Sequence, residues 1–559
     1  ALKRLRQCAP GIDGLSKCWI SPLSSTLVPF MTALFSYLYA HGKTISAWTL
    51  AVIVAVKKKE PSLVDMTNFR GIHLLQFCRQ WYAMCLLPEL EELSERVVPE
   101  EQQGFWRSGR IYAAYMALHA VIEQARLRGE RLYVAYVDVR RAFPSVRREL
   151  LWHKLSELGA SDSLVRALVG LYTDVTGSVK GMDGLSGVFD ILFGTREGGV
   201  ESPLLYVLFV ADLISDLDNT RLGGAPVELD GRQLRALQLA DDLALIARSE
   251  SDLNKLLQQW SHFCRRNHKE TSIKKTEIVI YTVETDGSLS FANGVFQVDA
   301  ESPLKFTYNS VTLTCSELFI YLGVLFDSRG GPECAWKHRD EKGTKAFGAL
   351  CGLLRWVPFL PFARTAELGE SLVGGAYLYS SDLWAPYIDQ RHKGVGRNFA
   401  SWLLGFGRRV RSECVAGWIP FRDLDLKGEA SVVRMLADGL RVGGLLTRAL
   451  RQLHQNWVHA PAVERKHTWL GRTLKMIRKV WPRFTLESCN VNGLKFSGLP
   501  QDYKGSCPHV AYFADASSLV WKRRQNQVLR APPSIHKQDY PLHALLKMAC
   551  TPADLQQLT

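Results

Sequence analysis

An Asp-Asp pair set between two strand-like runs constrains the fold of this chain more than any other feature. Asp241 and Asp242 follow the run at 234–239 and precede the apolar run at 243–247. Runs of this length and composition favour strands, and a short polar step between two of them predicts a tight β-hairpin. The hairpin would carry both carboxylates at its turn.

A third acid stands at the end of another predicted strand, because Asp138 follows the apolar run at 132–137. Carboxylates brought within a few ångströms of one another repel, so one takes up a proton unless cations neutralise the group. Magnesium suits such a place because it prefers oxygen ligands and is usually held by one or two carboxylates plus substrate phosphates. Asp-Asp pairs are also common in turns and helix caps, so the pair alone does not define a metal site.

The remaining patterns predict a mixed α and β architecture of several parts, as the length of 559 residues also suggests. Strand-like and helical runs alternate between about 131 and 330, which predicts a sheet covered by helices, and the chain beyond about 340 is mainly helical. Basic residues alternate there with aromatic ones, as at 469–484. Helical spacing of apolar residues marks 22–40, 110–127, 147–158 and 203–216, and a β-branched run occupies 50–56.

The charge balance favours a polyanionic partner. The net charge is +14, with 47% hydrophobic and 22% charged residues, which is ordinary for a globular protein. Each phosphate that Lys or Arg neutralises releases condensed counterions, so nucleic acid is the leading partner class. A basic surface that serves only solubility is the alternative.

Cysteine usage and hydropathy indicate the cellular setting. The twelve cysteines form no C-x-x-C pattern, and Cys507 with His509 is too little for a zinc site, so an intracellular, reducing location, nuclear or cytoplasmic, is expected. The chain begins without Met and without a signal pattern, as a piece of a longer polyprotein would. The apolar stretch at 30–40 is too short to span a bilayer, so no membrane helix or membrane partner is expected.

Nine short blocks follow one another along the chain: PGIDG at 10–14, the stretch from 48 to 59, NFRGI at 68–72, QGF at 103–105, DVRRAF at 138–143, GTREGGVESP at 194–203, LADD at 239–242, KT at 275–276 and FIYLGV at 319–324. In this order the blocks resemble the reverse transcriptases of non-LTR (LINE-type) retrotransposons, from about Pro10 to Tyr387. Each block is weak alone, and the order makes the resemblance specific.

The resemblance implies the α+β fold of a right-hand polymerase, with fingers, a palm built on an antiparallel sheet, and a helical thumb. The implied boundaries are 1–130 for the fingers and N-terminal extension, 131–330 for the palm with interleaved fingers helices, and 331–395 for the thumb. A mainly helical region of unknown role follows at 396–559. The activity implied is RNA-directed DNA synthesis from an RNA template, a DNA primer and dNTPs.

The resemblance also assigns the acids to metal binding. Asp138 and Asp241 would ligate two Mg²⁺ ions, with Asp242 beside them and Mn²⁺ as a possible substitute. Two such ions about 3.5–4 Å apart can activate a 3′-hydroxyl and steady the leaving pyrophosphate. Lys275 would be the lysine that protonates pyrophosphate, although it also fits a plain surface lysine.

Further roles follow for the incoming nucleotide. Phe143 would be the aromatic gate that fills the space of a ribose 2′-hydroxyl, with a core aromatic at a helix start as the alternative. Arg70 and Lys57 would hold the β- and γ-phosphates, and Lys58 or Lys59 could take the place of Lys57.

The template and primer would meet two further turns. Gly198, Ser202 and Pro203 would set a sharp turn into a helix whose N-terminus approaches the template and primer. The primer grip would be the block that contains the residues Tyr321, Leu322 and Gly323.

Four positions depart from the family pattern. Glu197 stands where Gln is common, Leu239 where an aromatic is frequent, Pro144 in place of Asp, and Ser272 in place of Asn. No metal ligand is lost, but Glu197 adds negative charge near the template path.

Two alternatives to an active polymerase therefore stay open. One is a catalytically silent RNA- or DNA-binding remnant, or a domesticated reverse transcriptase scaffold. The other is a group II intron maturase, which the block at 319–324 and the following 378–384 favour less than the non-LTR type.

Overall fold

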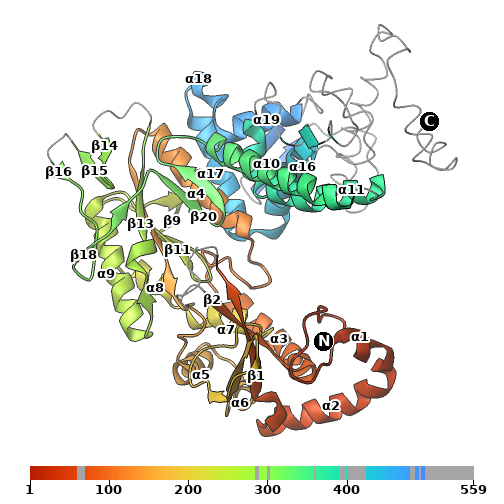
Figure 1. Cartoon of the computed structure of the whole chain (residues 1–559). Coiled ribbons are helices and arrows are strands. Elements are labelled where there is room, and N and C mark those ends of the chain that lie inside the picture. Colours follow the sequence, from red (N-terminus) through yellow and green to blue (C-terminus); the bar gives the residue numbers. More distant parts are fainter. Residues whose placement is uncertain are drawn as a thin grey trace, which may run out of the picture. The chain divides into compact units, whose positions relative to one another are not determined.

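The computed structural model (Figure 1) forms two compact units, residues 1–317 and 318–559, which are described one at a time. Within them the structure describes most of the chain up to residue 478. The described residues are 1–58, 69–283, 289–298, 302–357, 360–388, 395, 398–399, 402, 424–478, 485–489 and 493–497. Lys59 and the last 62 residues, 498–559, lie outside them.

The core of the first unit is a five-stranded sheet in the order β10-β11-β3-β13-β19. It is antiparallel except for the β13–β19 pair. Every residue of the central strand β3 is buried, so both of its faces are covered, and this explains why its sequence is continuously apolar rather than alternating. The strands are β3 (Leu132–Val137), β10 (Ala236–Leu239), β11 (Asp242–Ala247), β13 (Glu277–Tyr281) and β19 (Thr314–Cys315).

Helices cover this sheet. The amphipathic helix α9 (Glu250–Arg266) packs on β11 and β3, and Figure 1 draws it beside that sheet. Helix α4 (Ile111–Leu127) contacts β10 and β13. The predicted sheet with helical cover is therefore confirmed, and α4 matches the expected helix at 110–127 closely.

A second sheet, in the order β2-β1-β5-β6 with β7 beside β5, lies in the same unit. Strand β1 pairs antiparallel with β2 and parallel with β5, which lies more than a hundred residues further along the chain. The strands are β1 (Leu50–Lys57), β2 (Phe69–Leu74), β5 (Thr176–Gly181), β6 (Gly184–Leu185) and β7 (Phe189–Asp190).

The helix expected at 203–216 is divided in two, α7 (Ser202–Phe209) and α8 (Leu213–Asp218). The reason lies at the end of α7, where the buried ammonium of Lys154 donates to the carbonyl of Phe209 at 2.8 Å. A side chain thus replaces a helical N–H as the partner of that carbonyl. Other helices of this unit are α3 (Phe77–Val97), α5 (Arg148–Glu157) and α6 (Asp162–Leu171).

Near the start of the chain, α1 (Lys17–Ile20), a 3₁₀ turn and α2 (Ser24–His41) follow one another without a gap. Among the described residues, this stretch, Lys17–His41, is the one helix long and apolar enough to cross a membrane by length and composition. This helical stretch is longer than the apolar stretch at 30–40 because helical turns also occupy the residues before it, from Lys17 onward. Helices of soluble proteins and signal sequences pass the same test, so this is weak evidence for a membrane span.

The second unit opens with a hairpin, β20 (Leu318–Tyr321) and β21 (Val324–Asp327), and continues with helices. Trp384 and Trp469 are fully buried, and the Trp469 indole donates to the carbonyl of Leu383 at 2.9 Å. The helices include α10 (Glu333–Trp356), α11 (Phe362–Gly369), α13 (Ser381–Trp384), α16 (Leu424–Val442), α17 (Gly444–His459) and α19 (Trp469–Arg478). The hairpin β22 (Thr485–Cys489) and β23 (Gly493–Ser497) was not predicted.

Candidate active site

Three carboxylates meet at one end of the central sheet. Strand β3 ends directly before Asp138, and β10 and β11 form a hairpin whose two-residue turn is Ala240–Asp241. Strands β3 and β11 pair antiparallel with Val137 opposite Leu243, so the next step in the register brings Asp138 beside Asp242. The hairpin and the strand-end acid lie where the sequence predicted, but only Asp241 is in the turn, because Asp242 is the first residue of β11.

The charges of these acids act on one another. Burial raises the pKa of Asp241, and the charge of Asp138 raises it further. Part of Asp242 is exposed to solvent, but many protein atoms surround its carboxylate. The resulting desolvation, followed by the charges of Asp241 and Asp138, raises the pKa of Asp242 to about 6. Burial also raises the pKa of Asp138, against the lowering effect of Lys275 and Lys58. The group is therefore an acidic cluster that favours a neutralising cation.

The turn of the β10–β11 hairpin depends on Gln102, a residue that the sequence analysis did not single out. Its side chain is fully buried, and its Oε1 accepts hydrogen bonds from the backbone N–H of Ala240 and of Gly104, both at 2.8 Å. Ala240 is left-handed, with φ 57°, which is unusual for a residue with a Cβ atom. A Cβ on Gly104 would lie 2.6 Å from the Ala240 nitrogen, so glycine is required there. The only signal in the sequence was its place beside the QGF block.

Four cations act electrostatically on the acids, and one of them, Lys269, acts on Asp241. The charge of Arg70 lowers the pKa of Asp241 and of Glu197, and the charge of Lys58 lowers the pKa of Asp138 and of Glu197. The charge of Lys275 lowers the pKa of Asp138. Ser272, one of the departures, donates its backbone N–H to the carbonyl of Asp138 at 2.8 Å.

The β1–β2 register bears on the choice among Lys57, Lys58 and Lys59, which the sequence left open. In the β1–β2 register Arg70 is opposite Val56, and residues opposite one another point to the same face. Lys57, one residue further along β1, therefore points to the other face. Lys58, whose charge reaches Asp138 and Glu197, fits the phosphate role better.

The loop that leads into α7 is held by backbone contacts on both sides. Gly198 has φ 129°, and a Cβ there would lie 2.4 Å from the carbonyl oxygen of His73, so only glycine fits. The backbone N–H of His73 donates to the carbonyl of Glu197 at 2.6 Å, and the Gln80 side chain donates to that of Gly198, also at 2.6 Å. Gly198 and Glu197 are thereby fixed beside the strand that carries Arg70.

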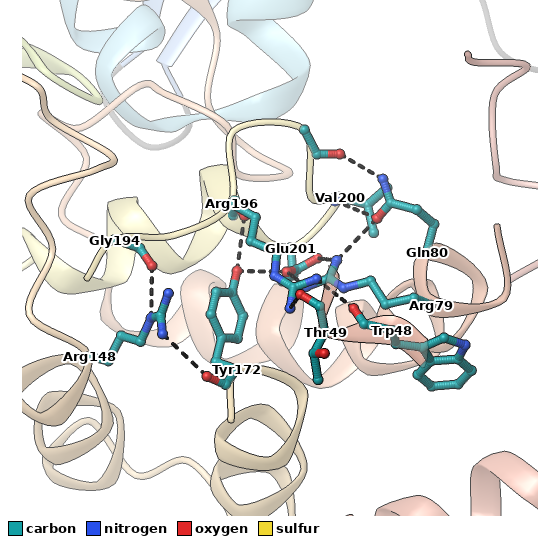
Figure 2. Close-up of polar contacts among 12 residues, drawn as sticks. Trp48, Thr49, Arg79, Gln80, Arg148, Tyr172, Gly194, Arg196, Val200 and Glu201 are labelled. Carbon is teal, nitrogen blue, oxygen red and sulfur yellow. Dashed lines mark hydrogen bonds and ion pairs between the residues drawn. The ribbon is translucent and has the colours of Figure 1, made fainter. Parts of the chain in front are cut away.

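Below this loop lies a buried ionic network, shown in Figure 2. Arg79 and Glu201 are both fully buried, and two hydrogen bonds of 2.6 and 3.0 Å join them. The hydroxyl of Tyr172 donates to Glu201 at 2.7 Å and contacts Ser202 at 3.1 Å. Burial lowers the pKa of Arg196, whose guanidinium donates to two backbone carbonyls, to about 9. Arg196 and Glu201 belong to the block at 194–203, but nothing in the sequence indicated that they are buried in one network with Arg79.

Ser202 and Pro203 begin α7, as predicted, and Ser202 is buried against Tyr172 rather than exposed to a ligand. Phe143, the expected gate, is partly buried and stacks on Tyr206 of α7, with ring centroids 4.8 Å apart and planes 29° apart. Its roles as gate and as core aromatic are both compatible with this position.

The second unit contains the expected primer-grip block. Leu322 and Gly323 form the turn of the β20–β21 hairpin, with φ 48° and 79°. The side chains of Tyr321 and Leu322 are buried, so the turn would offer its backbone rather than these side chains to a ligand.

The donor set for a metal is small. Among the described residues no group of three or more His, Cys, Asp or Glu side chains is arranged to hold a metal ion. Two carboxylates suffice for magnesium when substrate phosphates and water supply the other oxygens. The raised pKa values of Asp138 and Asp241 fit a site that is completed by its ligands.

Comparison with known proteins identifies the domain. Residues 56–325 match the family described as "Reverse transcriptase (RNA-dependent DNA polymerase)". These residues form a reverse transcriptase domain. The resemblance to non-LTR elements and the fold class, α+β with a right-hand polymerase domain, are thus confirmed.

Three relatives of the reverse transcriptase domain are retrotransposon proteins. The Pol polyprotein of the type-1 element R2 from Popillia japonica is 25% identical and covers 49% of this chain and 38% of its own. The polymerases of the X-element and of jockey, both from Drosophila melanogaster, are 23% and 25% identical; they cover 57% and 44% of this chain and 33% and 26% of their own. The chain thus spans about a quarter to two fifths of these relatives.

A solved structure is also similar. Telomerase from Candida albicans, in complex with a fragment of telomeric RNA, has a TM-score of 0.36 at 12% identity, with 81% of this chain and 66% of that chain covered. A TM-score this low carries no argument about function.

Proposed function

We propose that this chain is the RNA-directed DNA polymerase of a retroelement. It would join a deoxynucleotide to the 3′-hydroxyl of a primer at the acids Asp138, Asp241 and Asp242. The observation that carries the proposal is the meeting of these acids at one end of a helix-covered sheet within a reverse transcriptase domain. Divalent metals are general in this family, and we assign two Mg²⁺ ions, for which Mn²⁺ could substitute, to Asp138 and Asp241.

Bound magnesium would make the attacking 3′-hydroxyl easier to deprotonate and would stabilise the negative charge of the leaving pyrophosphate. The chain's own residues would bind and orient the nucleotide. Arg70 and Lys58 would neutralise the triphosphate, a role in which Arg offers two parallel donors. Lys275, whose charge acts on Asp138, would deliver a proton to the departing pyrophosphate. Phe143 would exclude a ribose 2′-hydroxyl.

The partners follow from the same assignment. An RNA template, a DNA primer and dNTPs are proposed, supported by the net charge of +14 and by the names of the relatives. Gly198 would bring backbone close to the nucleotide, Ser202 and Pro203 would begin the helix that approaches the template, and the turn at Leu322 and Gly323 would grip the primer. We place the protein inside the cell, in the nucleus or the cytoplasm, without a membrane partner. The division of the chain into fingers, palm, thumb and C-terminal region, with boundaries after residues 130, 330 and 395, stays a prediction.

Glu197 favours a second candidate, a catalytically silent RNA- or DNA-binding protein. Its carboxylate interacts with Arg70 and Lys58, the cations that would bind nucleotide phosphates, and with Asp241. A fixed carboxylate there competes with phosphate for the same cations. Glu197→Gln should therefore increase the affinity for dNTP if the polymerase is active.

Primer extension tests the proposal. Purified protein with a primed RNA template, dNTPs and Mg²⁺ should extend the primer, and Asp241→Asn should reduce extension by at least about 1,000-fold, since a lost metal ligand removes several kcal/mol of transition-state stabilisation. Asp183→Asn is the matched control, because Asp183 lies in the exposed turn of the β5–β6 hairpin. Equal incorporation by wild type and Asp241→Asn contradicts the proposal. Salt-sensitive RNA binding without any extension supports the second candidate.

A further inference from the structure

A lysine outside the motifs is buried close to the proposed nucleotide site. Lys269 lies between α9 and the short strand β12 (Glu270–Thr271), and its side chain is almost completely covered. Strand β12 pairs with β4 (Val139–Arg140), which follows Asp138 directly. The lysine is therefore delivered to the segment that carries Phe143.

The ammonium of Lys269 holds the turn around Phe143. Its Nζ donates to the carbonyl of Ala142 at 2.7 Å and to Oγ of Ser145 at 3.1 Å. Ala142 and Ser145 lie on either side of Phe143, so the two hydrogen bonds fix the backbone from which this ring projects.

The same ammonium also holds the ring on which Phe143 rests. It lies 5.0 Å from the ring centroid of Tyr206, within cation–π distance, and Phe143 stacks on that ring. One charged group thus contacts both the backbone below Phe143 and the aromatic surface behind it.

This placement is costly, which argues that it has a role. Burial lowers the pKa of Lys269 to about 7, because the charged form loses its hydration. A methionine of similar length would avoid that penalty, but it would leave the carbonyl of Ala142 without this donor.

We propose that Lys269 is a positioning residue for sugar selection, which fixes Phe143 so that nucleotides with a 2′-hydroxyl are excluded. The inference rests on the proposed polymerase function and on the gate role of Phe143. Steric exclusion of one hydroxyl requires that the Phe143 ring keeps its position. Supporting contacts of this kind are needed to hold site residues within about 0.5 Å of the productive geometry. A Phe143 that can tilt would admit the larger sugar.

The experiment compares single-nucleotide addition of dNTP and rNTP on a primed RNA template with Mg²⁺. In Lys269→Met, the ratio of kcat/KM for dNTP to that for rNTP should fall about 10-fold, equivalent to 1.4 kcal/mol. Ser145→Ala removes the longer of the two hydrogen bonds from Lys269, together with the 3.3 Å bond from Ser145 Oγ to the carbonyl of Ala142. It keeps the bond from Lys269 to Ala142 and should lower the ratio by a smaller factor. Because the charge of Lys269 also acts on Asp241, a general loss of rate is expected to affect both substrates, whereas the ratio isolates the sugar.

Lys154→Met is the matched control. Lys154 is also a buried lysine, its Nζ donates to the carbonyl of Phe209 at 2.8 Å and lies 4.8 Å from that ring, and Lys269 lies 4.9 Å from the same ring. No described hydrogen bond joins Lys154 to Ala142 or Ser145. Lys154→Met should therefore lower stability and leave the ratio unchanged.

The outcomes separate this inference from the proposed function. An unchanged ratio in Lys269→Met, or an equal fall in Lys154→Met, overturns the role of Lys269. If Lys269→Met does not fold, an unchanged ratio in Ser145→Ala overturns it instead. An unchanged ratio in Phe143→Ala removes the gate and this inference with it, while the polymerase assignment stands. A wild-type protein that adds no dNTP contradicts the proposed function itself.

Discussion

Two hairpins have two-residue turns, β10–β11 in the first unit and β20–β21 in the second. Groups of different charge hold the backbone of the two turns. At the first turn the backbone N–H of Ala240 is held by the buried amide of Gln102. At the second turn the carbonyls of Leu322 and Gly323 accept from Tyr379 and Arg339, the Tyr379 bond being 2.6 Å long.

The difference lies in what each support leaves at the tip. A neutral amide holds the first turn, so the negative charge of Asp241 and its neighbours is not cancelled within the hairpin. A guanidinium and a hydroxyl hold the second turn, whose side chain at Leu322 is buried. Similar turn lengths thus yield one tip that attracts cations and one that offers structured backbone.

The largest effect is expected from Gln102→Leu. This change leaves the N–H groups of Ala240 and Gly104 buried without their acceptor, at about 1–3 kcal/mol each. Local stability of the hairpin, measured by amide hydrogen exchange, should fall by about 2–6 kcal/mol, and primer extension should fall with it.

Gln103→Leu is the control for that change. The Gln103 side chain bonds to the carbonyl of Glu100 and to the N–H of Arg110, and neither belongs to the hairpin. Unchanged exchange at β10–β11 in Gln102→Leu would show that Gln102 does not hold the turn.

The next effect concerns metal and pH. The pKa of Asp242 rises from 3.8 to about 6 on folding, so the folded state binds more protons than the unfolded state between about pH 4 and 6. Stability of the metal-free protein should therefore fall as the pH rises through this window, and Asp242→Asn should reduce the fall. Thermal unfolding across this pH range, with the variant alongside, measures both.

Magnesium should reverse this loss at neutral pH. At about ten times its dissociation constant, Mg²⁺ should raise the unfolding temperature of the first unit by about 2 °C. The rise should be lost in the double variant Asp138→Asn/Asp241→Asn. An equal rise in that variant would mean that the ion binds elsewhere.

The smallest effect is expected at the second hairpin. Tyr379→Phe removes the hydrogen bond to the carbonyl of Leu322 and should reduce protection of β20–β21 by about 1 kcal/mol. Tyr37→Phe, at an exposed position on α2, should change nothing. If Mg²⁺ changes the hydrogen-exchange protection of both hairpins equally, the proposed difference in charge between their turns is wrong.

Particular residues show how far the sequence could lead. The run at 132–137 and Asp138 after it were predictable, because a continuous apolar, β-prone run and a terminal Asp are local properties of the chain. The same reasoning could not choose between Lys57 and Lys58, since the face to which a side chain points depends on the register of β1 with β2. Helix 203–216 was divided for a similar reason, because the partner of its carbonyl at Phe209 comes from Lys154, which is far away in the sequence.

The sequence by itself determined the order of the motifs, the strand-end acid and the hairpin at Asp241 and Asp242, and with them the resemblance to reverse transcriptases. Only the tertiary structure decided that Gln102 holds the turn, that Arg79 and Glu201 pair in the core, and that Lys269 reaches the backbone around Phe143. The physical reason is that buried polar groups must find partners wherever the fold brings them. Those partners are chosen by contacts between residues distant in the chain, which no local pattern records.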